Sequence, residues 1–294
     1  MKKTIVLLLS LFSFGCFRSE KNLGSPQNPL VLGLSKPYYE KLSSEAFSLL
    51  EKKINEKVGL FVKVEKFPES AGLIKQIGAG KVDMALLSVN EYLIARQDYK
   101  ALPVLQVLRG KEKKYFAGIA AIDRSINSID DLKGKKIAAR DPYSISGFVL
   151  PSMFFVKEKI KPHFVFTGSH EESIKRLFTG EVQAASVYEN MIKADKRLRL
   201  IQIMGPVPNE PVICRKGLKP ELCLRLKDAL LSIAMEKEGK EILHSMADIT
   251  GFDPVIADVY RDLHEIILYS GQDIYSLVPD SADLRKIQEP YYFD

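Results

Sequence analysis

LIKQIGAGKVDMALLSVN, residues 73–90, has the pattern of a short helix, a glycine stop and a buried strand. SIKRLFTGEVQAASVYEN, residues 173–190, aligns with it without a gap at an offset of 100. The identical pairs are Ile74/Ile174, Lys75/Lys175, Gly80/Gly180, Val82/Val182, Ala85/Ala185 and Asn90/Asn190. Similarity at a fixed offset indicates a duplicated supersecondary unit. The alternative is a chance likeness between two ordinary βα units, since glycine commonly ends helices.

Strand-like and helix-like segments alternate around both copies. The expected strands cover 28–35, 60–67, 81–89, 135–140, 163–168 and 181–187. The expected helices cover 45–59, 70–80, 148–160, 171–180, 218–236 and 239–247, and the pattern remains helical through 251–270. Alternating strands and helices predict α/β layers with largely parallel pairing. Two such units predict two open lobes, with ligand-binding loops at the carboxyl ends of their strands.

The predicted lobe boundaries follow from this repeat. We assign residues 29–118 and 226–294 to lobe 1, and residues 119–225 to lobe 2. The first crossing between lobes is placed at AGIAAIDRS, residues 117–125, and the second follows the region 201–217.

The N-terminus indicates export. Residues 1–15 have a basic start and an apolar run too short to span a bilayer of about 30 Å, which is typical of a cleaved leader. Cys16 directly follows this run and resembles the lipidated cysteine of a bacterial lipobox; the alternative is an incidental cysteine after an ordinary leader. Residues 16–28 are then expected to form a flexible tether, because they are rich in polar residues, Gly and Pro.

Composition excludes several classes of protein. The chain of 294 residues is 46% hydrophobic and 27% charged, as in soluble globular proteins. Its net charge of +6 is spread without a Lys/Arg block, so nucleic-acid binding is not expected. No metal-ligand spacing or cofactor motif is present, and Cys214 and Cys223 could either form a disulfide or remain separate thiols.

RDPYSISGF, residues 140–148, joins a predicted strand to a predicted helix. Pro151 fits only in or just after the first helical turn, so Ser146 is the expected N-cap. First-turn N–H groups, the helix dipole and the hydroxyls of Ser144 and Ser146 then form a site suited to an oxyanion, which Gly147 lets approach closely. The alternative is that both serines only cap the helix.

TGSHEES, residues 167–173, has the same construction. Ser169 and Glu172 have capping-box spacing, which places His170 at the first helical position. Two helix starts from one lobe favour a ligand role for His170 over a structural one. Tyr38, Tyr39 and Tyr92 lie in loops predicted on the opposite lobe, where their hydroxyls could close on an oxyanion or their rings could pack in the core.

Other polar groups belong to the same strand ends. Ser88 begins the loop before Tyr92, and Tyr188 follows the last repeated strand. Glu91 and Glu189 could engage a cationic group of a ligand or be solvated. No GxSxG, P-loop, HExxH or GxGxxG motif is present, so the sequence does not indicate an enzyme.

Five segments, in this order and spacing, resemble the substrate-binding proteins of ABC transporters for phosphate, phosphite and phosphonates. They are GKVDMALLSVNEY (80–92), SIDDLKGKKIAARDPYSISGFVLP (128–151), GSHEESIKRLFTGEVQAASV (168–187), PVPNEPVICRKGL (206–218) and ITGFDP (249–254). The resemblance covers nearly all of residues 29–265. It implies the type II periplasmic-binding fold, in which each lobe is an open mixed sheet flanked by helices and the ligand cleft lies between lobes.

The resemblance also implies a binding site. It assigns the oxyanion head to Ser144, Ser146, Gly147 and His170, and it maps Tyr92 and Tyr39 to aromatic positions on the facing lobe. Ser88 and Tyr188 complete the candidate set. The chain departs from the family pattern at Ile145, where Thr is usual, and at Tyr188, where Asp is common. These departures leave open a different small oxyanion or a less polar ligand.

The function implied is that of a monomeric solute receptor without a cofactor or catalytic activity. It would be anchored through a lipid on Cys16, in the periplasm or at the outer face of the bacterial cytoplasmic membrane. It would deliver a small phosphorus oxyanion or phosphonate to an ABC permease and ATPase. A receptor that presents ligand occupancy to a membrane sensor kinase is the main alternative, and an enzyme on the same fold is a further one.

Overall fold

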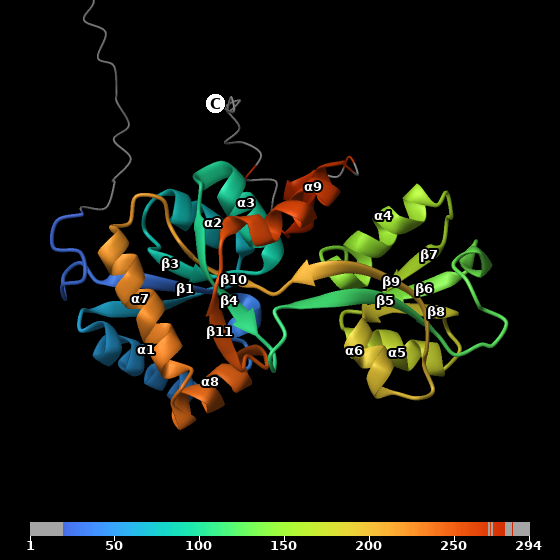
Figure 1. Cartoon of the computed structure of the whole chain (residues 1–294), viewed down its shortest axis with the longest axis horizontal. Coiled ribbons are helices and arrows are strands. Elements are labelled where there is room, and N and C mark those ends of the chain that lie inside the picture. Colours follow the sequence, from blue (N-terminus) through green and yellow to red (C-terminus); the bar gives the residue numbers. More distant parts are fainter. Residues whose placement is uncertain (1–19, 270, 272, 280–283, 285–294) are drawn as a thin grey trace, which may run out of the picture.

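The computed structural model describes residues 20–269, 271, 273–279 and 284. Its first lobe is built on a six-stranded sheet with the order β11-β4-β10-β3-β1-β2 (Figure 1). The strands are β1 (Leu30–Ser35), β2 (Val62–Phe67), β3 (Met84–Leu86), β4 (Leu102–Leu108), β10 (Pro211–Cys214) and β11 (Gly251–Pro254). β1 pairs in parallel with β2 and β3, whereas β10 and β11 pair antiparallel with their neighbours. The sheet is therefore open and mixed, as the resemblance implied, and the largely parallel pairing expected from the alternation of strands and helices is wrong for it.

The second lobe repeats this plan with the strand order β7-β6-β8-β5-β9. Its strands are β5 (Lys114–Ala121), β6 (Lys136–Ala139), β7 (His163–Phe166), β8 (Ala184–Tyr188) and β9 (Arg199–Pro208). β6 pairs in parallel with β7 and β8, and β5 pairs antiparallel with β8 and β9.

The two lobes are joined where β4 leads into β5 and where β9 leads into β10 (Figure 1). The crossings therefore lie at residues 109–113 and 209–210, earlier in the chain than the predicted boundaries at 118/119 and 225/226. AGIAA is part of β5 and not a connection, because it is hydrogen-bonded to β8 and β9. β10 and the helix after it belong to lobe 1, because β10 is inserted between β3 and β4.

Helices cover both faces of the lobe 1 sheet. α2 (Ser70–Gly78), α3 (Val89–Tyr99) and α9 (Arg261–Tyr269) lie on one face, and α1 (Ser44–Val58), α7 (Pro220–Ile233) and α8 (Lys237–Ala247) lie on the other (Figure 1). Short helical turns are η1 (Lys36–Tyr38), η4 (Ala257–Tyr260) and η5 (Ile274–Leu277). The predicted helix over 251–270 begins only after β11, because residues 251–254 pair with β4 at the sheet edge.

Lobe 2 carries α4 (Leu150–Lys157) on one face and α5 (His170–Phe178) and α6 (Glu189–Ala194) on the other (Figure 1). Short turns at η2 (Asp130–Leu132) and η3 (Ile145–Val149) complete it. The repeat predicted from the sequence is visible in the stops of α2 and α5. Gly80 and Gly180 both have left-handed φ values, 70° and 77°, and the next valines, Val82 and Val182, are both buried.

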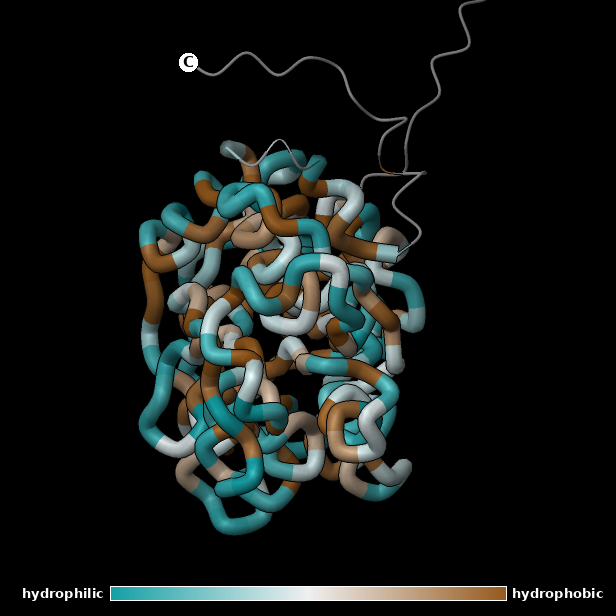
Figure 2. The backbone as a smooth tube through the Cα atoms, turned by 90° about the vertical axis from the view of Figure 1, so that its right-hand side faces the viewer, coloured by the Kyte–Doolittle hydropathy of each residue, from teal (hydrophilic) through white to brown (hydrophobic). Residues whose placement is uncertain are grey.

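A buried apolar cluster runs through both lobes. It joins Leu73 and Ile94 of lobe 1 to Ile137, Val149 and Phe155 of lobe 2. A second cluster fills the other face of the lobe 1 sheet, under α1, α7 and α8. Figure 2 views the molecule from the lobe 2 side and shows that many outward loops are hydrophilic. Among the described residues, no helix is long and apolar enough to cross a membrane.

The predicted flexible tether is wrong for its described part. Residues 22–28 form a turn that is fixed to lobe 1, because the Phe61 N–H donates to the Gly24 carbonyl at 2.9 Å and Leu23 packs against the apolar cluster. Glu20 also pairs with Arg215, whose Nε donates to the buried Asp83 at 2.9 Å. Cys16 and the predicted leader lie outside the described residues.

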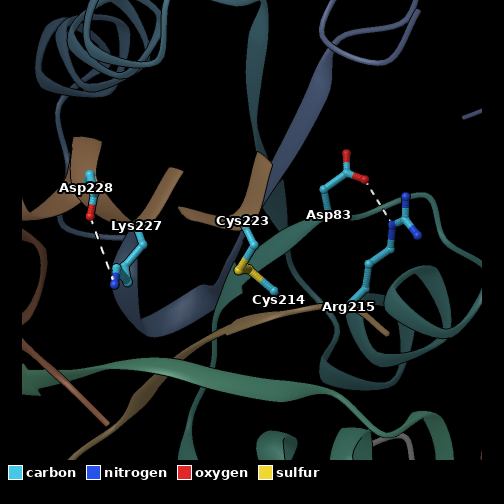
Figure 3. The surroundings of a disulfide bond; sticks show 6 residues. All are labelled: Asp83, Cys214, Arg215, Cys223, Lys227 and Asp228. Atoms are coloured by element: carbon cyan, nitrogen blue, oxygen red, sulfur yellow. Dashed lines mark hydrogen bonds and ion pairs between the residues drawn. A yellow bond between two sulfur atoms is a disulfide. The ribbon is translucent and has the colours of Figure 1, made fainter. Parts of the chain in front are cut away.

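Cys214 and Cys223 are joined in a disulfide that connects the end of β10 to α7 (Figure 3). Their Cα atoms are 6.2 Å apart, and the bridge closes a loop over a sequence separation of 9. The two cysteines therefore form a disulfide and do not remain separate thiols. A disulfide fits a protein that folds in an oxidising compartment.

Opening this loop should destabilise the protein measurably. Closing a loop of this length restricts the unfolded chain by an entropy equivalent to about 2.5 kcal/mol. The Cys214→Ser/Cys223→Ser double variant is therefore expected to lose about that much free energy of unfolding in urea titrations. An equal stability of the variant and the oxidised wild-type protein would contradict the stabilising role.

Candidate functional site

The first candidate element is the helix start that follows β6. Ser144 is its N-cap, and its Oγ accepts a hydrogen bond from the Gly147 N–H at 3.0 Å. The predicted cap at Ser146 is wrong, because residues 145–149 form a π-helical turn that starts the helix two residues earlier. The N–H groups at the start of this turn have no partners within the helix, as at any helix N-terminus.

Contacts with the neighbouring strands hold this turn in place. The Ser186 hydroxyl on β8 donates to the Ser146 carbonyl at 3.1 Å. Pro151 has no backbone N–H, so it cannot donate a hydrogen bond to a carbonyl of this turn. The Ser146 side chain is buried beside the Tyr115 hydroxyl of β5. Burial, then nearby Glu210, raises the pKa of Tyr115, so its hydroxyl stays protonated and able to donate.

The second element is the start of α5. The Ser169 Oγ accepts from the Glu172 N–H at 3.0 Å, which confirms the predicted cap and places His170 at the first helical position. His170 is 9% exposed and its ring lies edge-on to Tyr188, with centroids 5.3 Å apart. Its Nδ1 is buried without a hydrogen-bond partner among the described residues.

Burial and the positive charge of Arg140 lower the pKa of His170 to about 4. The imidazole is therefore neutral near pH 7, with one nitrogen donating and the other accepting. Because an unfolded histidine has a pKa of about 6.5, the unfolded chain takes up a proton here between pH 6.5 and 4 while the native protein does not.

This difference predicts a stability loss on acidification. As the pH falls from 7 to 4, the free energy of unfolding should drop by up to about 3 kcal/mol more in the wild-type protein than in His170→Gln. Urea titrations at both pH values measure this difference. Carboxylate protonation affects both proteins alike, so parallel losses would contradict the shifted histidine.

Lobe 1 meets these helix starts through Asn90 at the beginning of α3. Its Nδ2 donates to the Tyr143 carbonyl of lobe 2 at 2.7 Å, so the two lobes are in direct contact beside Ser144. Ser88 caps α3 in a capping box with Glu91. The Glu91 carboxylate accepts from the Ser88 N–H at 2.7 Å and from the Ser70 hydroxyl at 2.6 Å.

The candidate tyrosines occupy different environments. Tyr92 is fully buried, packs on Tyr260 with ring centroids 4.7 Å apart, and has a pKa raised by burial to about 12. Tyr39 is half-buried and turned toward Lys66. Its neighbour Tyr38 lies deeper, where its hydroxyl donates to the Leu87 carbonyl at 3.3 Å.

An ion pair occupies the crossing between lobes. Arg109 donates through Nη1 and Nη2 to the two carboxylate oxygens of Glu210, at 2.6 and 3.3 Å. After burial, the Glu210 charge is the main influence that raises the pKa of Tyr38. Burial and the charges of Glu171 and Asp248 raise the pKa of Tyr188 in lobe 2, and the positive charge of Arg109 opposes this rise. Groups from both lobes therefore lie around this pair.

The structure places Ser144, Ser146, Gly147, His170 and Tyr188 on lobe 2, where Ser144 contacts Gly147 and His170 contacts Tyr188. The sequence did not single out Asn90, Tyr115, Arg109 or Glu210 as site residues. Their roles depend on contacts between segments far apart in the chain, and only the position of Asn90 after a strand end was a usable signal. In the described chain, no group of three or more His, Cys, Asp or Glu side chains could hold a metal ion.

The two mixed sheets, each flanked by helices, give the chain the two-lobed type II periplasmic-binding fold, which it shares with solved structures of this class. The chain belongs to the family described as "ABC transporter, phosphonate, periplasmic substrate-binding protein", whose model matches residues 36–260. The family consists of transport proteins that bind substrates, which agrees with the resemblance inferred from the sequence.

Individual relatives are distant. The chain is 25% identical over 221 residues to the phosphate-import protein PhnD of Mycolicibacterium smegmatis, covering 67% of this chain and 69% of the relative. It is 23% identical over 256 residues to the phosphonates-binding periplasmic protein of Escherichia coli, covering 81% and 75%. A Prochlorococcus marinus PhnD1 structure in complex with methylphosphonate has the same fold, with a TM-score of 0.64, 17% identity, and coverage of 83% of this chain and 98% of that one.

Proposed function

We propose that this protein captures a small phosphorus oxyanion or phosphonate between its lobes and delivers it to an ABC permease and ATPase. The observation that carries the proposal is the pair of helix starts on lobe 2. One is capped by Ser144 and the other begins with His170, whose buried Nδ1 lacks a partner in the described chain. Helix N-termini and hydroxyls suit an oxyanion, and a buried polar atom without a partner is expected to meet a ligand or water.

Ser144, Ser146, Gly147 and His170 bind the oxyanion in this proposal. Ser88, Tyr39, Tyr92 and Tyr188 remain candidates from the sequence, with Tyr188 supported by its contact with the His170 ring. Tyr38 joins them because it is buried near the Arg109–Glu210 pair. Catalysis is not part of the proposed function, and the protein acts as a monomer.

Ile145 explains why the ligand could differ from that of relatives with a hydroxyl at this position. Its side chain is buried and belongs to the apolar cluster that runs through both lobes. It therefore contributes packing rather than a hydrogen bond, and the oxyanion must rely on the serines on either side.

Three of the carboxylates near the lobe boundary already have partners. Glu91 accepts from Ser70 and Ser88, Glu189 pairs with Lys193 at 2.8 Å, and Glu210 pairs with Arg109. A ligand ammonium group that bound one of these three carboxylates would have to displace its partner. We therefore expect the ligand to be an oxyanion without a cationic substituent.

Calorimetry with phosphate, phosphite, methylphosphonate and 2-aminoethylphosphonate tests both parts of the proposal. At least one of the first three should bind with one-to-one stoichiometry, and 2-aminoethylphosphonate should bind no more tightly than methylphosphonate. If none of the four binds, the proposed function fails. If 2-aminoethylphosphonate binds much more tightly than methylphosphonate, only the expectation of a ligand without a cationic substituent is overturned.

The proposed location is the outer face of the cytoplasmic membrane or the periplasm, with Cys16 carrying a lipid. The leader pattern in residues 1–15 and the disulfide support export. Mass spectrometry of the protein from bacterial membranes should find an N-terminal Cys16 with added acyl chains. An unmodified Cys16 would contradict the anchor and leave the ligand proposal intact.

A further inference from the structure

Asn90 contacts three parts of the molecule at once. It lies in the first turn of α3 in lobe 1 and is 6% exposed. Its Nδ2 donates to the Tyr143 carbonyl of lobe 2 at 2.7 Å and to the Leu277 carbonyl of η5 at 2.9 Å. The side chain therefore joins the lobe 2 loop to the C-terminal segment of the described chain.

These two bonds fix the orientation of the amide. Both acceptors are backbone carbonyls, so the opposite orientation would set Oδ1 against two oxygens that have no proton to donate. With Nδ2 committed to them, Oδ1 points elsewhere. It is buried and has no hydrogen-bond partner among the described residues, although buried carbonyl oxygens normally have one.

The surroundings of Asn90 indicate what this acceptor meets. Tyr143, to which Asn90 is bonded, directly precedes Ser144 and the proposed oxyanion site. A carbonyl oxygen repels a fully ionised ligand oxygen, but it accepts a hydrogen bond from a protonated one. His170, on the opposite lobe, is also neutral and has a buried nitrogen without a partner in the described chain.

We propose that the Asn90 Oδ1 accepts a hydrogen bond from the protonated oxygen of a phosphorus oxyanion and so selects a ligand that carries a P–OH group. The inference rests on the proposed function and deepens it. A phosphonate monoanion has such a group, whereas a sulfonate of nearly the same shape has no proton at neutral pH. Asn90 is thus a specificity-determining residue as well as a contact between lobes.

The two roles of Asn90 make different predictions for a pair of ligands. Displacement calorimetry can compare methylphosphonate with methanesulfonate, so that weak sulfonate binding also yields a dissociation constant. The wild-type protein should prefer the phosphonate by at least about tenfold, as expected for a hydrogen bond in a charged site. In Asn90→Ala this preference should shrink by a similar factor.

A purely structural role gives another result. If Asn90 only holds the lobes together, Asn90→Ala will weaken both ligands by the same factor and leave their ratio unchanged, which would overturn the inference. Equal wild-type binding of the two ligands would also overturn it. Asn190→Ala is the matched control, because Asn190 is the exposed counterpart of Asn90 in the repeat and should leave affinities and ratio unchanged.

Thermal melts of Asn90→Ala guard against misfolding. Asn90→Ser offers a second variant if the alanine variant does not fold, because its shorter side chain also removes Oδ1. If the wild-type protein binds no phosphorus oxyanion at all, the proposed function fails first and this inference falls with it. If the wild-type protein binds methylphosphonate and Asn90→Ala leaves the ratio of the two affinities unchanged, only this inference is contradicted.

Discussion

Replacing both Ser144 and Ser146 by alanine is expected to weaken methylphosphonate binding by about 100-fold or more. Each hydroxyl that donates to an ionised oxygen contributes about 1.5–3 kcal/mol, or roughly a factor of 10 to 150. Both serines lie in the first turn of the helix that begins at Ser144, and both side chains are buried, so water replaces them poorly. Calorimetric titration of the wild-type protein and the variant measures the loss.

The control for this variant is Ser152→Ala on the same helix. The Ser152 hydroxyl donates to the Val149 carbonyl at 2.9 Å and takes no part in the proposed site. The double variant also loses the Ser144 cap, which costs about 1 kcal/mol of stability, so melting curves must show that it is folded at the titration temperature. If the folded double variant kept wild-type affinity, the oxyanion would not bind at this helix start.

Gly147→Ala is expected to weaken binding by about tenfold or more while the fold persists. A Cβ at this position would lie 2.8 Å from the Ser144 Oγ and 3.1 Å from the Arg140 Cβ. The Ser144 side chain would have to move, which would break the hydrogen bond that its Oγ accepts from the Gly147 N–H. The added methyl group would also occupy space beside the N–H groups that are proposed to receive the oxyanion. Titration with methylphosphonate measures the effect.

Gly72→Ala provides the matched glycine control. Gly72 lies in α2, and a Cβ there would meet only the Glu69 side chain, at 3.8 Å. Alanine is favoured over glycine inside a helix by about 0.5–1 kcal/mol, so this variant should be slightly more stable and bind normally. Equal binding by Gly147→Ala and Gly72→Ala would show that the ligand does not approach Gly147.

Local patterns predicted much of this fold. The alternation of strands and helices, the glycine stops at Gly80 and Gly180, and the cap at Ser169 depend on residues close together in the chain. The duplicated unit also predicted two open lobes, whereas their mixed sheets were implied only by the family resemblance. The boundaries between lobes were misplaced because sheet membership depends on pairing, and β5 resembles a connection until its partners β8 and β9 are known.

The candidate site was predictable only in part. The expected cap at Ser146 followed from Pro151 alone, but the start of the turn also depends on the Ser186 hydroxyl, 40 residues away. Asn90 contacts Tyr143, 53 residues away, and Glu210 contacts Arg109, 101 residues away. A local sequence pattern cannot predict contacts at such separations. The sequence identified the loops that lead into the helices capped by Ser144 and Ser169, and it could not show which of their side chains are turned toward each other.

The central claim is that a phosphorus oxyanion lies between the lobes at the starts of the helices led by Ser144 and His170. A crystal structure of the protein with methylphosphonate tests it most directly. The account predicts phosphonate oxygens within hydrogen-bond distance of Ser144, Ser146 and the Nδ1 of His170. A bound methylphosphonate that contacts none of these three residues would contradict it.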